Sequence, residues 1–326
     1  MPNQPTILCR ELSLLAFNRR VLAQARDEGV PLLERLRFLC IVSSNLDEFF
    51  EVRMAWLKKE SQLNPHMLLD NGTTPAETMA AAAAEAKKLI QEQYELFNKE
   101  LVPALRQEGI FFYPRRQWTD QQRAWIESYF DRELLPILTP LGLDPAHPFP
   151  RLLNKSLNFV VSLSGKDAFG RASGMAVVQA PRILPRVVKL PEGLGEGHGF
   201  VLLSSILHAY VHKLFPGMDV EGCYQFRLTR NSELTVDEED LTNLRAAVQT
   251  ELRERQYGDE VRLEVADNCP PHVAEFLLAQ CNLSPNELYQ VVGPVNLVRL
   301  MAVPDMVDRP DLKFPPFSPG LPKDVR

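Results

Sequence analysis

The sequence predicts a multidomain fold, in which a small all-α helical bundle is followed by an α+β domain with a small, mainly antiparallel sheet. Three observations support this. Apolar residues keep helical spacing through the first hundred or so positions, and short alternating runs typical of strands begin near Asn158. Residues 304–326 contain six prolines, which disfavours an interior helix or a central strand. We therefore expect a helical domain at 1–107, an α+β domain at 108–303 and a proline-rich connector at 304–326.

The first predicted helix has an apolar stripe at i, i+3, i+7 and i+11, formed by Leu14, Phe17, Val21 and Ala25. We expect this stripe to face the bundle core. Gly29 and Pro31 should end this helix and open the next. The inward face of that second helix is predicted to be Leu32, Leu36, Leu39 and Cys40.

A polar break follows at Ser43, Ser44 and Asn45. Asn45 with Glu48 three residues later fits an N-cap and an N3 acid, so a helix is predicted to begin there. A helix amino terminus offers free N–H groups and partial positive charge, which suits a phosphate or nucleotide. The alternative is that Asn45 simply caps its own helix, and the residues alone favour that alternative.

Stronger helix signals follow. Thr74, Pro75 and Glu77 form an N-cap, a first-turn proline and a capping-box acid, and they predict a helix that runs to Gly109. A proline at position 103 should kink its last turns. A further helix should open at Thr119.

The α+β domain is predicted from alternating runs and caps. The expected strands are Phe159–Leu163, Met175–Val178, Tyr224–Arg230 and Val261–Val265. The expected helices are Ser204–Leu214, Glu238–Gln256 and one opened by Asn268, Pro270 and Pro271, with a capping box at Ser284–Glu287.

The length of 326 residues allows two ordinary domains, and the net charge of −6 argues against a nucleic-acid binder. No apolar run reaches the ~20 residues that span a bilayer. The five cysteines are scattered and include no C-x-x-C pair, which indicates reduced thiols in a cytoplasmic protein.

Candidate sites for chemistry are weak. The glycines at 193, 195, 197 and 199 match no nucleotide fingerprint and are interpreted as a loop. His208 and His212 have the spacing of a metal pair but lack a third ligand, so ordinary helix histidines are favoured. The set Cys269, His272 and Cys281 lacks zinc-module spacing and is interpreted as structural.

Two basic pairs, Arg182 with Arg186 and Arg227 with Arg230, could meet phosphate or could lie on solvated edges, and the sequence leaves both open. No complete active site and no metal site can be assembled from the residues.

One long stretch is far more specific. Residues 10–59 read RELSLLAFNRRVLAQA and then PLLERLRFLCIVSSNLDEFFEVRMAWLKK. This stretch resembles the amino-terminal domain of bacterial polyphosphate kinase of the phosphohistidine type. The likeness continues through LTPLGLDPAHPFPRLLNKSLNF (138–159), PRILPRVVKLP (181–191), FRLTRN (226–231), LRERQYGDEVRLEV (252–265) and DRPDLKFPPF (308–317), which are similar to the head domain of that family. Leu14 departs from the tryptophan usual in the family, which we expect to affect core packing rather than chemistry.

The resemblance implies reversible transfer of the terminal phosphate of ATP to polyphosphate through a phosphohistidine, with Mg²⁺ as cofactor. In the family the phosphorylated histidine and the magnesium-binding arginines belong to two domains beyond the head, so no catalytic residue and no metal ligand carries over to this chain. His147 is interpreted as a structural loop residue. What carries over is Asn45, whose counterpart in the family contacts ATP, and this reverses the preference for a simple cap.

The resemblance also implies self-association as a homodimer or homotetramer, and a cytoplasmic location, with peripheral attachment to the inner membrane left open. A helix terminus contributes ~0.3–1 kcal/mol to binding a charge, whereas micromolar affinity needs about 8 kcal/mol. We therefore expect the isolated chain to bind ATP weakly and to make no polyphosphate. The alternative function is a free-standing, non-catalytic module for oligomerisation or anion binding.

Overall fold

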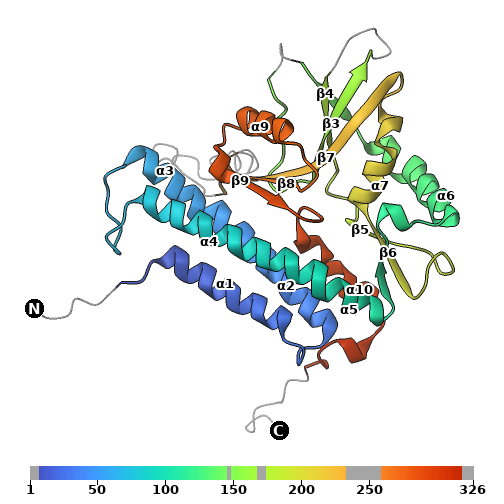
Figure 1. The fold of residues 1–326 in the computed structure, drawn as a ribbon, viewed down its shortest axis with the longest axis horizontal. Helices are drawn as coiled ribbons and strands as arrows, with labels where there is room; N and C mark the ends of the chain where they lie inside the picture. Colours follow the sequence, from blue (N-terminus) through green and yellow to red (C-terminus); the bar gives the residue numbers. More distant parts are fainter. Residues whose placement is uncertain (1–6, 145–147, 167–173, 233–257, 318–326) are drawn as a thin grey trace, which may run out of the picture.

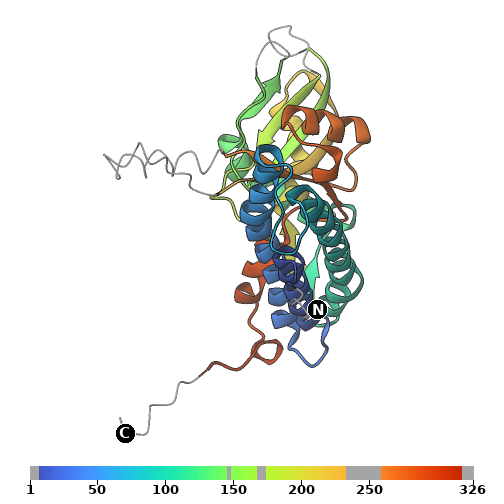
Figure 2. The same cartoon turned by 90° about the vertical axis from the view of Figure 1, so that its left-hand side faces the viewer.

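The computed structural model describes residues 7–144, 148–166, 174–232 and 258–317, and it confirms a helical region followed by a mixed α/β region. Figure 1 shows the long helices side by side below the sheets, and Figure 2 shows the same two parts from the side. The predicted helix at 238–256 and the residue His147 lie outside the described residues. The helices of the first part are α1 (Arg10–Arg26), α2 (Leu32–Glu48), α3 (Ala55–Leu63), α4 (Pro75–Leu96) and α5 (Val102–Gln107).

The buried face of α1 differs from the prediction. Leu14 and Phe17 are 40% and 50% exposed. Ala25 is buried as predicted, but the rest of the inward stripe consists of Glu11, Leu15, Asn18 and Leu22, so Leu15, Asn18 and Leu22 each lie one position after the expected residue. The apolar spacing predicts the wrong face because two of the inward residues, Glu11 and Asn18, are polar. Burial of Asn18 is possible because its amide donates to the carbonyl of Val42 at 3.0 Å.

The prediction that a helix begins at Asn45 is wrong. Asn45 lies inside α2, whose first residue is Leu32, and the helix continues through a π-helical turn, η1 (Phe49–Met54), into α3. The polar run at 43–45 does not break the helix, because Ser43 accepts a hydrogen bond from Gln93 of α4 at 2.7 Å. Asn45 therefore cannot use the free N–H groups of a helix terminus.

The predicted start of α4 is confirmed. Thr74 and Glu77 form a reciprocal capping box, and the helix begins at Pro75. Ahead of Pro103 the ladder widens into a second π-helical turn, η2 (Phe97–Leu101), before α5. A proline lacks the donor for a regular i→i−4 bond, so a change of helix type at this place is expected.

The second part contains two sheets where one was predicted. The larger has six strands in the order β2-β4-β3-β7-β8-β9, antiparallel throughout except for the parallel pair β8/β9. The smaller has the order β1-β6-β5. The strands are β1 (Ile110–Phe112), β2 (Pro140–Leu143), β3 (Asn158–Gly165), β4 (Met175–Gln179), β5 (Val187–Lys189), β6 (His198–Leu202), β7 (Met218–Arg230), β8 (Glu260–Ala266) and β9 (Leu288–Val291).

Helices cover both faces of the larger sheet (Figure 1). They are α6 (Asp120–Tyr129) and α7 (Leu203–Tyr210) on one face and α9 (Pro271–Gln280) on the other. Alternation along β3 explains this, since Phe159 and Val161 pack with the α6 and α7 side while Val160 packs with the α9 side. The shorter helical segments are η3 (Arg115–Gln117), η4 (Phe130–Leu134), η5 (Leu135–Ile137), η6 (Val211–Leu214), η8 (Pro285–Glu287), η9 (Leu297–Ala302), α10 (Val303–Met306) and η10 (Pro310–Leu312).

The last described segment returns to the helices. Cys40 donates through its thiol to the carbonyl of Leu297 at 3.2 Å, and Arg37 pairs with Asp305 at 2.7 Å. Val303 and Val307 are buried in the same hydrophobic core as α1, α2 and α4. This core also includes residues of β8 and β9, so the helical bundle and the α+β part share one hydrophobic core.

Candidate functional site around Asn45

The Asn45 side chain faces α1. Its Nδ2 donates to Oδ1 of Asn18 at 3.1 Å, and Asn18 in turn donates to the carbonyl of Val42. A carbonyl can only accept, so this relay fixes both amides. Asn45 Oδ1 is then left as an acceptor that no described residue engages.

A cavity of about 280 Å³ opens beside this amide pair, between α1 and the junction of α2 with η1. Its lining is Arg10, Leu14, Leu15, Phe17, Asn18, Asn45, Leu46, Glu48, Phe49, Val52 and Arg53. The mix of apolar walls with a few convergent polar groups is typical of small-molecule sites.

Two of the three charged residues that line the cavity are arginines. Arg10 and Arg53 form no ion pair or side-chain hydrogen bond with any described residue, and Glu48 is the one carboxylate of the lining. The exposed ring of Phe17 carries the Arg20 guanidinium 5.5 Å from its centroid. An exposed ring beside unpaired cations can stack on a base and meet phosphate.

The π-helical turn positions three of the lining residues. A wider turn shifts the helical register, and such turns are frequent at functional sites. Here the turn begins at Phe49 and directs Phe49, Val52 and Arg53 toward the cavity, while Phe50, Glu51 and Met54 are buried on the opposite side.

Asp47 lies on that opposite side and binds the sheet. Its carboxylate accepts from Arg227 of β7 at 2.8 and 2.9 Å and from Arg262 of β8 at 2.7 Å. Burial opposes ionisation of Asp47, but Arg227 and Arg262 outweigh it and lower the pKa. Glu264 completes the group by accepting from Arg227 Nε at 2.6 Å.

Glu51 makes a second connection. It accepts from Asn154 at 2.6 Å and from Lys155 at 2.8 Å. The segment NLDEFFEVR (45–53) thus lines the cavity with one face and joins the helices to the α+β part with the other.

The basic pair Arg227 and Arg230 does not lie on a solvated edge. Both side chains are buried, Arg227 in the group with Asp47 and Arg230 against the carbonyls of Leu152 and Gly258 at 3.0 and 2.9 Å. Of the other pair, Arg182 donates to the carbonyl of Asn154 and Arg186 to that of Ala180 at 3.2 Å.

The remaining candidates have structural places. Gly193, Gly195 and Gly197 lie in the hairpin loop between β5 and β6, as predicted, whereas Gly199 lies in β6. His208 lies in α7 but His212 lies in η6, and the Arg115 guanidinium is 2.8 Å from His208 Nδ1. Burial and Arg115 lower the pKa of His208.

The set of Cys269, His272 and Cys281 does not converge on a common site. His272 is exposed while both thiols are buried, and burial raises the pKa of Cys269 to about 11 and of Cys281 to about 12. Within the described ranges, no group of three or more His, Cys, Asp or Glu could hold a metal ion. Nor is any described helix long and apolar enough to cross a membrane.

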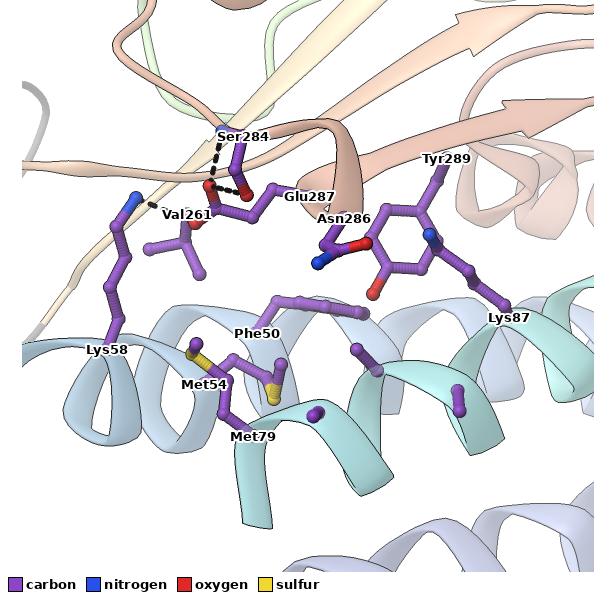
Figure 3. Close-up of a pocket in the computed structure, with 13 residues that line it drawn as sticks. Phe50, Met54, Lys58, Met79, Lys87, Val261, Ser284, Asn286, Glu287 and Tyr289 are labelled. Atoms are coloured by element: carbon purple, nitrogen blue, oxygen red, sulfur yellow. Dashed lines mark hydrogen bonds and ion pairs between the residues drawn. The ribbon is translucent and has the colours of Figure 1, made fainter. Parts of the chain in front are cut away.

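A second cavity, of about 270 Å³, lies between the α3 and α4 helices and the η8–β9 segment (Figure 3). Its charged groups are already engaged: Lys58 pairs with Glu287 at 2.7 Å, and Lys87 lies 5.3 Å from the centre of the Tyr289 ring. Ser284 and Asn286 are uncharged polar residues of its lining, and Phe50, Met54 and Met79 line its floor. This second cavity therefore offers a phosphate group fewer free cations than the Asn45 cavity does.

The sequence indicates Asn45 but not its partner Asn18, nor the lining residues Arg10, Phe17 and Arg53. Phe17 continues an apolar spacing, which predicts a core residue. Asn18, a polar residue on a helix face predicted to be apolar, was the one available signal that this face also serves a site. Leu14 also lines the cavity. Its departure from the tryptophan usual in the resembled family therefore affects the wall of this cavity and not core packing.

The chain is similar to known proteins along nearly its whole length. A family model described as the polyphosphate kinase N-terminal domain matches residues 7–113, and one described as the polyphosphate kinase middle domain matches residues 121–303. A polyphosphate kinase of Neisseria meningitidis serogroup C is 73% identical over 321 residues, which are 98% of this chain and 47% of that protein. One from Burkholderia lata is 56% identical over 320 residues, again 98% of this chain and 47% of that protein.

The crystal structure of polyphosphate kinase from Porphyromonas gingivalis has the same fold over 98% of this chain and 44% of that one, with a TM-score of 0.77 at 24% identity. The chain spans about half the length of the curated relatives it matches. With both family models in chain order and the second covering more than half of its residues, the chain belongs to the polyphosphate kinase family.

Proposed function

We propose that this chain supplies the nucleotide contact of a polyphosphate kinase, with ATP bound in the Asn45 cavity. The observation that carries the proposal is the free acceptor Oδ1 of Asn45, held by Asn18 at the edge of a cavity with one exposed ring and two unpaired arginines. Family membership supports ATP and polyphosphate as the substrates.

Each group has a chemical role in this proposal. Asn45 Oδ1 accepts a hydrogen bond from an amino group of the base or a hydroxyl of the ribose. Phe17 and Leu14 cover the base, since stacking on an aromatic side chain is worth ~1–3 kcal/mol per base. Arg10 and Arg53 face the phosphates, where guanidinium groups bind oxyanions through paired N–H donors.

The reaction proposed for the whole enzyme is reversible transfer of the ATP terminal phosphate to polyphosphate through a phosphohistidine. Mg²⁺ would accompany the triphosphate and neutralise part of its charge. Glu48 is the one carboxylate in the cavity lining, so the residues here fit a base and phosphates but not a metal ion. We therefore assign this chain binding and orientation of the nucleotide, with phosphoryl transfer outside it.

The test uses Asn45→Ala with Asn64→Ala as the matched control. Asn64 is an exposed asparagine whose amide reaches only Glu60, at 2.7 Å. A few hydrogen bonds and one stacking contact amount to about 4 kcal/mol, so we expect millimolar affinity of the chain for ATP. Saturation-transfer NMR should show contacts to the base and ribose protons in the parent chain and the control, and lose them in Asn45→Ala.

Two results would count against the proposal. One is equal saturation transfer to ATP from Asn45→Ala and from the parent chain. The other is displacement of ATP by tripolyphosphate that is as effective as displacement by ADP. A micromolar dissociation constant, or polymer formation by the chain alone, would contradict the assignment of only a contact to this part.

Self-association as a dimer or tetramer is a second part of the proposal, and it is supported by family membership alone. Sedimentation velocity over a wide range of concentration tests it. A monomer at the highest concentration would show that these residues are insufficient for assembly.

A further inference from the structure

A small cavity lies where the start of α7, strand β7 and the η9 segment meet, away from Asn45. Its volume is about 30 Å³. Its polar lining is Lys155, Arg186, Ser204, Gln225, Asn296 and Arg299. Three of these residues are cations, namely Lys155, Arg186 and Arg299.

Arg186 is only half satisfied. Its Nη2 donates to the carbonyl of Ala180, but Nη1 is buried without a hydrogen-bond partner. An unpaired buried N–H of a charged group is costly, and buried polar atoms without partners are uncommon in native proteins. The unmet donor indicates that an acceptor belongs in this place.

Asn296 has the second unmet group. Its Oδ1 is also buried without a partner, and its backbone is left-handed at φ 83°. Rotation of an amide exchanges its oxygen and nitrogen, so the same position can present an N–H donor. A bound acceptor would therefore satisfy Asn296 and Arg186 together.

No described carboxylate lines the cavity around Arg186 and Asn296. Arg299 makes no ion pair or side-chain hydrogen bond within the described part of the chain. Burial, Arg299 and Arg182 lower the pKa of Arg186 to about 10, so Arg186 stays charged at neutral pH beside like charges. Lys155, the third cation of the lining, is already paired with Glu51 at 2.8 Å, and Glu51 also accepts from Asn154 at 2.6 Å.

The backbone adds donors. The α7 helix begins beside the cavity, with Ser204 in its first turn. Its first N–H, that of Leu203, already donates to the carbonyl of Arg186 at 3.0 Å, and no side-chain cap engages the N–H groups that follow. Free N–H groups at a helix start favour anions. Here they reinforce a site that the arginines already define.

We propose that this cavity binds one tetrahedral oxyanion, a phosphate group, between Arg186 and Arg299 with Asn296 as a further donor. One water needs ~10–15 Å³, so 30 Å³ holds about two or three oxygen-sized groups, which is room for the oxygens of one phosphate group that face the arginines but not for a nucleoside. The ligand is either free inorganic phosphate or the end group of a polyphosphate chain. The site is separate from the Asn45 cavity and does not depend on it.

Unfolding temperature measured against phosphate concentration, at ionic strength held constant with sodium chloride, tests the proposal. A ligand that binds only the folded state raises this temperature in a saturable way. Arg299→Gln is the key variant because Arg299 supports no other described contact. Arg132→Gln is the control, an exposed arginine that pairs only with its neighbour Glu133 at 3.0 Å.

We expect saturable stabilisation of the parent chain and of Arg132→Gln, and a half-saturating phosphate concentration at least about tenfold higher in Arg299→Gln. Tripolyphosphate is the second probe, and its half-saturation is read from the part of the shift that Arg299→Gln loses, because the arginines of the Asn45 cavity also offer it a site. A value well below that of phosphate identifies the end of a chain as the ligand, and equal values identify free phosphate. No saturable shift in the parent chain, or the same shift in Arg299→Gln, would overturn the site. ATP binding at Asn45 would be unaffected by that outcome.

Discussion

Asp47 and Arg227 form a two-point ion pair across 180 residues of sequence, in which Nη2 donates to Oδ1 at 2.8 Å and Nη1 donates to Oδ2 at 2.9 Å. Arg262 shares the same carboxylate, and its guanidinium lies 4.2 Å from the centre of the Phe50 ring. The pair joins the helix that carries Asn45 to the sheet. The position of the Asn45 cavity therefore depends on a buried ion pair as well as on apolar packing.

We predict that Asp47→Asn lowers the free energy of unfolding by ~3–5 kcal/mol, because it leaves two buried arginines with Glu264 alone. Urea unfolding of the chain measures this. Asp131→Asn is the control, since its exposed pair with Lys213 at 2.8 Å should contribute at most ~1 kcal/mol. Similar losses for the two variants would mean that the Asp47 pair has no special stabilising role.

The same pair predicts a pH dependence. The folded-state pKa of Asp47 lies below its ordinary value of 3.8, so its contribution is fully present above that value and is lost as pH falls through the folded pKa. Asp47→Asn has no such carboxyl group. The stability difference between parent chain and variant should therefore be constant near neutrality and narrow in acid, and urea midpoints measured at descending pH would show it. A difference that is unchanged in acid would contradict the assignment.

The elements that the sequence predicted well are those whose determinants lie close together in the chain. The capping boxes at Thr74 and Thr119 each close within three residues, and both helices begin where expected. Partners of the site residues are distant instead: Asn18 is 27 residues from Asn45, and Arg262 is 215 residues from Asp47. Propensity and spacing contain no information on such pairs, so the resemblance could indicate Asn45 but not what surrounds it.

The exposed ring at the cavity leads to a third prediction. Phe17→Ala should change the free energy of unfolding by less than ~0.5 kcal/mol, because the ring is 50% exposed, yet weaken nucleotide binding about fivefold or more through lost stacking. NMR titration with ATP measures the affinity. Phe314→Ala, which removes a ring of 51% exposure away from the cavity, should leave the affinity unchanged. A loss of stability with unchanged affinity would place Phe17 in the fold rather than the site.

Leu14 offers the converse change. It is 40% exposed and lines the cavity beside Phe17 and Asn18, so a larger side chain there can grow over the opening without entering the core. We predict that Leu14→Trp strengthens ATP binding by about five- to tenfold, since an indole adds a stacking surface worth ~1 kcal/mol or more. Binding of tripolyphosphate, which has no base, should not change. The two ligands are compared by NMR titration of the same sample, with urea unfolding to verify that stability is kept. Equal gains for both ligands would show that the indole acts on the phosphates or on the fold, and a loss of ATP binding would show that Leu14 already closes against the base.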